Sequence, residues 1–193
     1  MKTISVQEAI KQLQAGAIGV MPTDTVYGLV ARAADESAVA RLYAAKHREH
    51  KPGTVIAASI DQLVELGVKR RYLKAVEDMW PNPLSIVLPI GADLHYLTQD
   101  VTSLAMRIPA NRDIRDLLEQ TGPLITSSAN QPGEEPASTV AEAEAYFNDT
   151  VDFYVDGGVL DSANSSTVVR VVDDAIEVLR QGKLKLDANG YPL

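Results

Sequence analysis

The sequence predicts an α/β domain built on a mixed sheet. Segments with helical periodicity alternate with short apolar segments that have the length of buried strands. Several later strand candidates are joined by turns as short as Asp173-Asp174, too short for a crossover helix, so some neighbouring strands must run antiparallel. The 193 residues contain no repeat, low-complexity tract or linker, so we expect a single domain over 1–193.

The first half of the chain alternates helices with strands. Ser5 and Glu8 form a capping box before apolar residues at helical spacing, and Gly16 ends that helix. Pro22 ends the apolar strand that follows. The elements expected here are helices over about 5–16, 35–45, 59–67 and 69–79 and strands over 17–21 and 54–58.

The second half is richer in strands. Asn111 and Thr139 are good N-cap residues, and they begin helices that end near residues 120 and 147. The expected strands are 84–88, 104–108, 123–127, 152–156, 166–172 and 175–179.

Composition excludes several classes of protein. Cysteine is absent, which excludes disulfides, thiolate metal sites and cysteine nucleophiles and fits a reducing cytoplasm. No apolar run is long enough to cross a membrane, and the first residues lack the apolar core of a signal peptide. We therefore expect a cytoplasmic location. The net charge of −8 repels nucleic acid at long range, so stable binding of tRNA by this chain alone is not expected.

Motif searches narrow the chemistry further. The chain has no Walker phosphate loop, no dinucleotide-binding G-x-G-x-x-G and no G-x-S-x-G nucleophile elbow. His47 and His50 are spaced to share a metal, but no third ligand lies near them in the sequence. A solvated polar face is the better interpretation, and no metal ligands are predicted.

A polar segment, PTDTVYGL over 22–29, directly follows a buried strand. Its hydroxyls and carboxylate would emerge at a sheet edge, where α/β proteins bind ligands. The alternative is an ordinary strand-to-helix turn capped by Thr23 or Asp24.

A basic segment, KHREHKP over 46–52, interrupts this acidic sequence. The alternative to a binding role is a solvated helix end, where cations are favourable. However, Pro52 pushes Lys51 out of the helical region. If the helix ends near Lys46, the side chains of Lys46 and Arg48 point to the same side; in a continuing helix they diverge.

Two further features point to an anionic ligand. The segment TSSANQPG over 126–133 follows a strand and offers hydroxyls, an amide and backbone N–H groups to an anion. An ordinary polar loop is the alternative. Arg107 lies within the apolar run LAMRIP, and a charge in a buried strand needs a partner or an anionic ligand.

Taken in order, these segments resemble the YrdC-like family of threonylcarbamoyl-AMP synthases, in the short form without an extra C-terminal domain. The resemblance covers about residues 20 to 182. The matching pieces are PTDTVYGL (22–29), K-x-R at Lys46 and Arg48, WPNPLSIVL (80–88), MRIP (106–109), SSAN before Gly133, STVV (166–169) and LRQG (179–182).

The resemblance implies a twisted mixed sheet with flanking helices around a deep basic cavity. It implies a nucleotidyltransferase that joins L-threonine, bicarbonate or CO2, and ATP into threonylcarbamoyl-AMP and pyrophosphate for the t6A modification of tRNA adenosine 37. Mg2+ would accompany ATP, held largely by the phosphates. A downstream tRNA threonylcarbamoyl-transferase complex would be the partner.

The resemblance also implies residue roles. Lys46 and Arg48 would act in catalysis. The residues that would hold ATP are Lys46, Arg48, Lys51, Thr126, Ser128, Asn130, Ser138 and Arg180. The residues that would hold threonine are Thr23, Thr25, Arg107 and Ser166.

Departures from the family pattern leave alternatives. Glu49 stands where the family usually has proline and Gly53 where it has leucine; Asn82, Ser85 and Arg170 also depart from it. An acid beside two ATP-binding cations fits a non-catalytic or weakly active paralogue that binds nucleotide or double-stranded RNA. Carbamoyl adenylation is a rival activity, as in the related domain of hydrogenase maturation proteins. Those proteins add acylphosphatase and zinc-finger domains.

Overall fold

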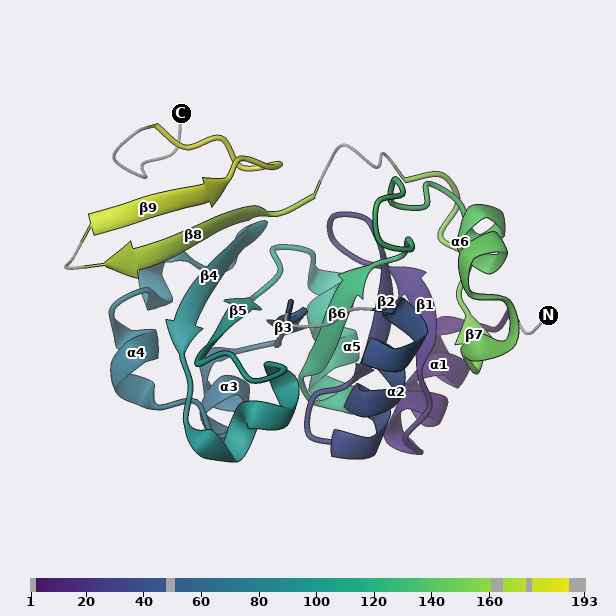
Figure 1. Ribbon diagram of the computed structural model, residues 1–193, viewed down its shortest axis with the longest axis horizontal. Helices are drawn as coiled ribbons and strands as arrows, with labels where there is room; N and C mark the ends of the chain where they lie inside the picture. Colours follow the sequence, from purple (N-terminus) through teal and green to yellow (C-terminus); the bar gives the residue numbers. More distant parts are fainter. Residues whose placement is uncertain (1–2, 48–50, 161–164, 173–174, 188–193) are drawn as a thin grey trace.

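The computed structural model describes residues 3–47, 51–160, 165–172 and 175–187 (Figure 1). This part of the chain forms a nine-stranded sheet in the order β7-β1-β2-β6-β3-β5-β4-β8-β9. The strands are β1 (Gly19–Pro22), β2 (Tyr27–Arg32), β3 (Thr54–Ile56), β4 (Leu84–Pro89), β5 (Ser103–Arg107), β6 (Leu124–Ser128), β7 (Phe153–Tyr154), β8 (Thr167–Val172) and β9 (Ala175–Arg180).

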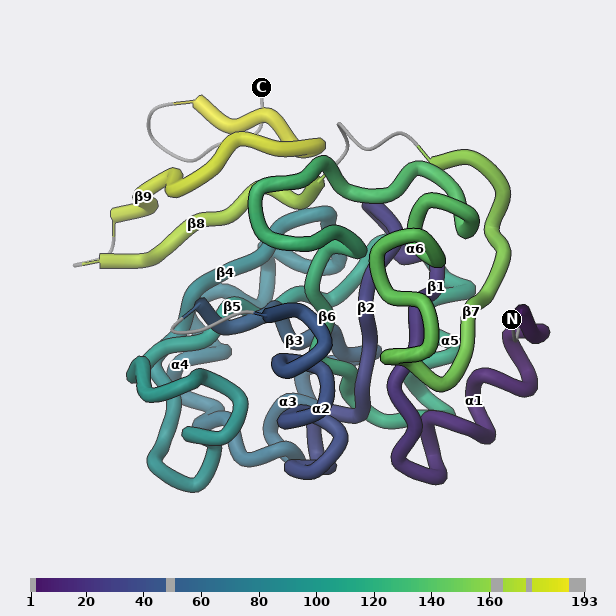
Figure 2. The backbone as a smooth tube through the Cα atoms, turned by 45° about the vertical axis from the view of Figure 1, so that its right-hand side comes forward, coloured from purple at the N-terminus to yellow at the C-terminus, as the bar shows by residue number. Residues whose placement is uncertain are grey.

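The predicted mixed sheet is confirmed. β1 pairs with β7, β3 with β5 and β4 with β8 in parallel, whereas the other neighbouring pairs are antiparallel. The turn at 173–174, from which short connections were argued, lies outside the described residues. Figure 2 shows the β8–β9 pair at one end of the sheet and β7, close to the N-terminal helix, at the other.

The helices begin where local capping predicts. Ser5, Ser59, Asn111 and Thr139 each accept a hydrogen bond from a backbone N–H three residues ahead. The α-helices are α1 (Val6–Gln14), α2 (Glu36–Lys46), α3 (Ile60–Leu66), α4 (Arg70–Lys74), α5 (Arg112–Thr121) and α6 (Val140–Phe147). The 3-10 turns are η1 (Glu77–Met79), η2 (Ala92–Leu97) and η3 (Asn148–Thr150).

Both faces of the sheet are covered, since successive residues in a strand point to opposite faces. Leu29 and Val30 of β2 therefore belong to two different core clusters. One cluster contains the buried apolar residues of α2, and the other contains those of α1 and α5. In Figure 1, α2 lies in front of β2 while α5 lies behind the sheet. A sheet buried on both faces leaves ligands access mainly at strand ends and in gaps between helices.

Three predictions about elements were wrong. Residues 27–32 form strand β2, paired with β1 as a hairpin, so a strand-to-helix turn after Pro22 is excluded. The helix expected over 69–79 is broken into α4 and η1, with Val76 at φ −133° between them. The strand expected over 152–156 is reduced to the two residues of β7.

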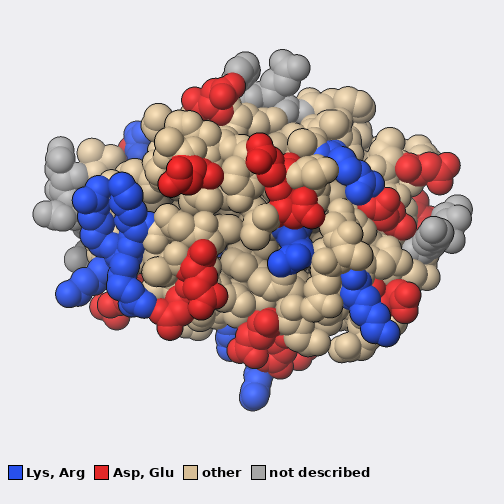
Figure 3. Space-filling view, turned by 90° about the horizontal axis from the view of Figure 1, so that it is seen from below, with Lys and Arg blue, Asp and Glu red and all other residues tan. Residues whose placement is uncertain are grey.

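The surface carries both signs of charge (Figure 3). Seen from below, basic side chains gather at the end of the molecule where α4 lies, and acidic side chains are spread over the rest of this face. The exposed cations of that helix and its N-cap are Lys69, Arg70, Arg71 and Lys74. Within the described ranges no helix is long and apolar enough to cross a membrane.

Candidate active site

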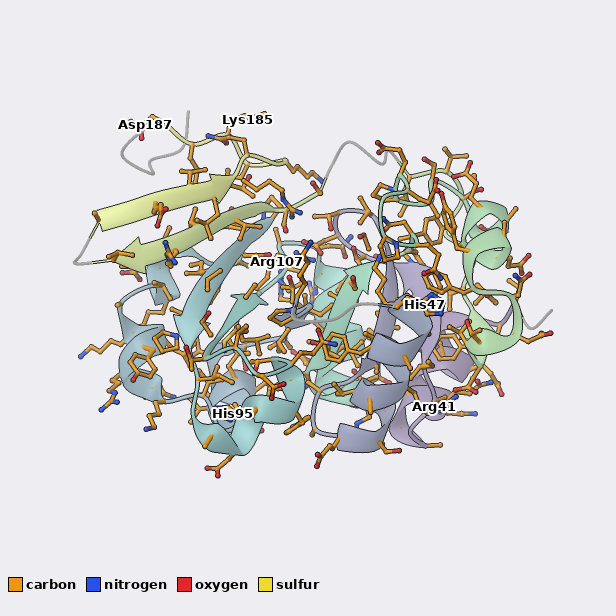
Figure 4. The ribbon with its side chains drawn as sticks, viewed as in Figure 1. Arg41, His47, His95, Arg107, Lys185 and Asp187 are labelled. Carbon is orange, nitrogen blue, oxygen red and sulfur yellow. The ribbon has the colours of Figure 1, made fainter. Side chains whose placement is uncertain are left out.

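A cavity of about 310 Å³ opens over the middle of the sheet. Its walls come from the neighbouring strands β2, β6, β3 and β5, together with β8 and the end of β9. Among the described residues that line it, the charged side chains are Arg107 and Arg180, and most of the polar ones are hydroxyls. Figure 4 shows Arg107 near the centre of the molecule. The lining therefore suits an anionic ligand.

One wall of the cavity is the turn between β1 and β2. The Thr23 hydroxyl donates to the carbonyl of Val26 at 2.7 Å. The same oxygen accepts hydrogen bonds from the backbone N–H groups of Thr25 and Val26 at 3.2 and 3.3 Å. Because these bonds close the turn on itself, the hydroxyls of Thr23 and Thr25 are held 3.2 Å apart at the cavity.

Arg107 ends β5 and is buried. Its Nη2 donates to Oδ1 of Asp24 at 2.8 Å, and its Nη1 donates to Oγ of Ser85 at 3.2 Å. Ser85 in turn donates to Oγ of Ser166 at 3.0 Å. The sequence required a partner or an anionic ligand for this arginine. The structure provides the partner, Asp24, and still leaves Arg107 on the cavity wall.

Arg180 joins this network through Ser166. Its Nε and Nη2 donate to the carbonyl of Ser166 at 3.2 and 2.8 Å. Burial and, secondarily, the charge of Arg107 lower the pKa of Arg180 below its ordinary value. The two guanidinium groups therefore share one electrostatic environment, and an anion between them would relieve their repulsion.

The segment after β9 fixes Arg180 in place. The backbone N–H of Gly182 donates to Oγ1 of Thr167 at 2.9 Å, and that of Lys183 donates to the carbonyl of Ser165 at 2.8 Å. The two backbones approach so closely that a Cβ added to Gly182 would lie 2.2 Å from the carbonyl oxygen of Ser165. Glycine is needed here because any larger residue would push this segment, and Arg180 with it, away from β8.

Lys46 is the last residue of α2, and His47 follows it in the left-handed conformation at φ 48°. The helix therefore ends where the binding interpretation required. Lys46 is 3% exposed, and its Nζ donates to the carbonyl of Ser128 at 2.7 Å and to both the carbonyl and Oδ1 of Asn130. The ammonium group thus holds together the loop that follows β6.

Asn130 organises the same loop. Its Oδ1 also accepts a hydrogen bond from the Ser128 hydroxyl at 2.6 Å, and its Nδ2 donates to the carbonyls of Gln131 and Glu134. Since Ser128 lines the cavity and Lys46 lies behind the loop, one network joins helix α2 to the cavity wall.

The structure brings most of the predicted site residues together. Those that line the cavity are Thr23, Thr25, Arg107, Thr126, Ser128, Ser166 and Arg180. Lys46 and Asn130 lie behind this lining in the network described above. Ser138 lies just before α6, where its backbone N–H donates to Glu142. Lys51 is exposed beside the lining residues Pro52 and Gly53. Arg48 and Glu49 lie outside the described residues.

Sequence reasoning missed Asp24 and Ser85 as parts of the site. The Asp24 carboxylate was considered as part of a polar segment at a sheet edge or as a helix cap, and Ser85 as a strand residue that departs from the family pattern; neither was given a role in the site. The sequence did indicate that such partners are needed. The hydroxyl of Ser85 in the buried strand LSIVL needs a polar partner, and the buried Arg107 needs a partner such as Asp24. The pairing itself spans 83 residues of sequence, and no local pattern reports it.

A metal site would need several ligating side chains close together. Across the described ranges, no group of three or more His, Cys, Asp or Glu side chains is placed to hold a metal ion. His47 instead contacts Oε1 of Gln131 through Nδ1 at 3.1 Å.

If the loop after β6 binds ATP, as the family resemblance implies, Asn130→Ala is expected to raise the KM for ATP by roughly 10- to 150-fold, because the loop loses the charged hydrogen bond from Lys46 that holds it beside the cavity. It also removes one acceptor from the Lys46 ammonium, so the free energy of unfolding should fall by about 1–3 kcal/mol. Steady-state kinetics and urea unfolding measure the two effects.

The matched control is Asn111→Ala, which removes the cap of α5 away from the cavity. It should lose about 1 kcal/mol of stability with the KM for ATP unchanged. An unchanged KM in Asn130→Ala would show that the loop after β6 does not bind the nucleotide.

Comparison with known proteins agrees with this architecture. The family model described as Telomere recombination, that of Sua5, YciO and YrdC, matches residues 11–182. A Coxiella burnetii protein named threonylcarbamoyl-AMP synthase is 33% identical over 186 residues, which cover 92% of this chain and 97% of the relative.

Two solved structures share the fold. The structure of P. abyssi Sua5 complexed with L-threonine matches with a TM-score of 0.83 and 29% identity over 96% of this chain. This chain spans only 58% of that longer one. E. coli YciO matches with a TM-score of 0.76 and 23% identity over 92% of this chain and 88% of its own, a likeness of fold alone. Since the family model covers most of its length, the chain belongs to the Sua5/YciO/YrdC family.

Proposed function

We propose that this chain is a threonylcarbamoyl-AMP synthase, a nucleotidyltransferase that forms threonylcarbamoyl-AMP and pyrophosphate from L-threonine, bicarbonate or CO2, and ATP. The observation that carries the proposal is the cavity, which places the buried Arg107 and the more exposed Arg180 among hydroxyl groups. Support comes from the Coxiella burnetii relative of that name and from the L-threonine complex of P. abyssi Sua5. The product would supply the t6A modification of tRNA through a downstream transferase complex.

The threonine end of the cavity is the Arg107 side. A guanidinium binds a carboxylate through two parallel hydrogen bonds, so Arg107 would take the carboxylate of threonine. The hydroxyls of Thr23, Thr25 and Ser166 line the same region and would hold the polar groups of the amino acid. The fixed turn at Thr23 orients the substrate before reaction, which lowers the entropy cost of bringing the reactants together.

The nucleotide end is formed by Arg180 and the loop after β6. Thr126 and Ser128 line the cavity there, and Lys46 and Asn130 hold the loop behind them. Arg180 would neutralise charge on the phosphates. Lys51, Ser138 and Arg48 are assigned to ATP by the family resemblance. It also implies that Lys46 and Arg48 assist the leaving pyrophosphate, but the Lys46 ammonium is buried behind the loop and would act by holding that loop in place.

The reaction requires alignment of the reacting groups and neutralisation of the charge on the phosphates, and it does not require a strong acid or base. The neutral amine of threonine adds to CO2 and releases one proton to solvent, which gives a carbamate; a carbamate oxygen then attacks the α-phosphorus while pyrophosphate leaves. Cations near the leaving group stabilise the charge that develops on it. Magnesium, which supplies further neutralisation of the phosphates, would enter with ATP and not in a cage of protein carboxylates.

Pyrophosphate release from ATP is expected only when L-threonine and bicarbonate are both present. The measurement omits each component in turn and follows pyrophosphate with a coupled assay. Release without a requirement for threonine would exclude a threonylcarbamoyl-AMP synthase. Binding of ATP and threonine with no release would identify a non-catalytic paralogue instead.

A further inference from the structure

We propose that Asp24 is a positioning residue that determines the specificity of the threonine site. Asp24 fixes and neutralises the Arg107 guanidinium, so that Arg107 selects a carboxylate by orientation and not by unbalanced positive charge. This inference rests on the proposed function, because the threonine site was assigned to Arg107 there.

The first observation is the burial of the ion pair. The side chains of Arg107 and Asp24 are only 4% and 5% exposed, and the two charged groups meet at 2.8 Å. Removing two charges from water is expensive, and apolar residues of similar size often stabilise a protein as well as a buried pair does. Fold stability alone therefore does not explain why a pair is buried beside the cavity.

The second observation is that the pair is incomplete. Within the described part of the chain, Oδ2 of Asp24 and Nε of Arg107 are buried without a hydrogen-bond partner. A carboxylate and a guanidinium can pair through two parallel hydrogen bonds, yet here a single oxygen of Asp24 is used. Asp24 therefore restrains Arg107 without taking up all of its five donors, and donors remain for a ligand.

The third observation is that Arg107 is held from two separate elements of the fold. Asp24 lies inside the turn that Thr23 closes, and its backbone carbonyl is 3.4 Å from Nζ of Lys183. Ser85, the other partner of Arg107, belongs to β4 in the sheet. Arg107 is thus held at two points, by the turn between β1 and β2 and by the neighbouring strand β4.

The fourth observation is electrostatic. Arg107 lies close enough to Arg180 for its charge to lower the pKa of Arg180. Asp24 offsets one of these two positive charges. Without Asp24, the cavity would attract any small anion more strongly, while the Arg107 guanidinium would lose its fixed orientation. Loss of the Asp24 charge should therefore weaken the binding of threonine and strengthen the binding of a simple anion.

The test is Asp24→Asn, which removes the charge and keeps the shape of the side chain. The KM for L-threonine should rise at least about tenfold, because a charged hydrogen bond no longer orients Arg107. The inhibition constant for pyrophosphate should fall at least about threefold, because the cavity gains one net positive charge. Equilibrium titrations with L-threonine and with pyrophosphate accompany the kinetics.

Ser85→Ala separates orientation from charge, because it removes the second anchor of Arg107 and leaves the net charge unchanged. The KM for threonine should rise while the inhibition constant for pyrophosphate stays the same. This variant also decides the question if Asp24→Asn does not fold, since Ser85→Ala leaves the ion pair in place. Unchanged threonine affinity in Ser85→Ala would then overturn the proposal.

The alternatives give other patterns in Asp24→Asn. If Asp24→Asn damages the cavity in general, the binding of threonine and of pyrophosphate should both weaken. If Asp24 acts only through its negative charge, the binding of both should tighten. Either result overturns the positioning role. If the wild-type protein releases no pyrophosphate, the proposed function fails. The two titrations would still show whether Asp24 sets the preference for threonine over pyrophosphate.

Discussion

Lys46→Met is expected to lower ATP-dependent turnover at least about 100-fold and the free energy of unfolding by at least about 3 kcal/mol. The Lys46 ammonium is buried and donates to three oxygen atoms of Ser128 and Asn130. Methionine fills a similar volume but leaves these acceptors unsatisfied, and each hydrogen bond to a charged group contributes about 1.5–3 kcal/mol. The loop that lines the nucleotide end of the cavity should then lose its fixed shape.

Urea unfolding and pyrophosphate release measure the two effects of Lys46→Met. The matched control is Lys74→Met, the same substitution at an exposed position of α4. It should change stability by no more than about 0.5 kcal/mol and leave turnover unchanged. If Lys46→Met is as stable as this control but inactive, then Lys46 acts on ATP alone and does not hold the loop.

Gly182→Ala is expected to remove most of the activity and at least about 2 kcal/mol of stability. A Cβ at this position would lie 2.2 Å from the carbonyl oxygen of Ser165 and 2.5 Å from that of Ser166. Both are backbone atoms, so no side-chain rotation relieves the overlap, and overpacking of this kind typically costs 1–3 kcal/mol or more. The segment must move away from β8 and carry Arg180 out of the cavity.

Thermal unfolding and the KM values for ATP and threonine measure the effect of Gly182→Ala. Gly91→Ala is the control, since a Cβ there meets nothing within 4 Å and its φ of −79° is open to every residue. Alanine at that position should leave stability unchanged or raise it slightly. Full activity in Gly182→Ala would show that Arg180 does not need this close approach.

Most of the secondary structure followed from local sequence. The caps at Ser5 and Thr139 depend on hydrogen bonds from residues three positions ahead, so they can be predicted from the local sequence. The end of α2 at Lys46 was left open, because Pro52 disfavours the helical conformation only at Lys51; in the structure, His47 in the left-handed conformation ends the helix. Strand β2 was missed because it is almost entirely buried on both faces, and such a strand shows no alternation of polar and apolar residues.

The sequence by itself determined the fold class, the family and the polar segments that line the cavity, because caps, turns and apolar periods depend on near neighbours in the chain. Only the tertiary structure decided the roles within the site. It paired Arg107 with Asp24 and placed the Lys46 ammonium behind the loop after β6. It also brought Gly182 into close contact with the backbone of Ser165 and Ser166 just before β8. These contacts join residues far apart in the chain, and the partner of a buried charge is fixed by packing and not by spacing.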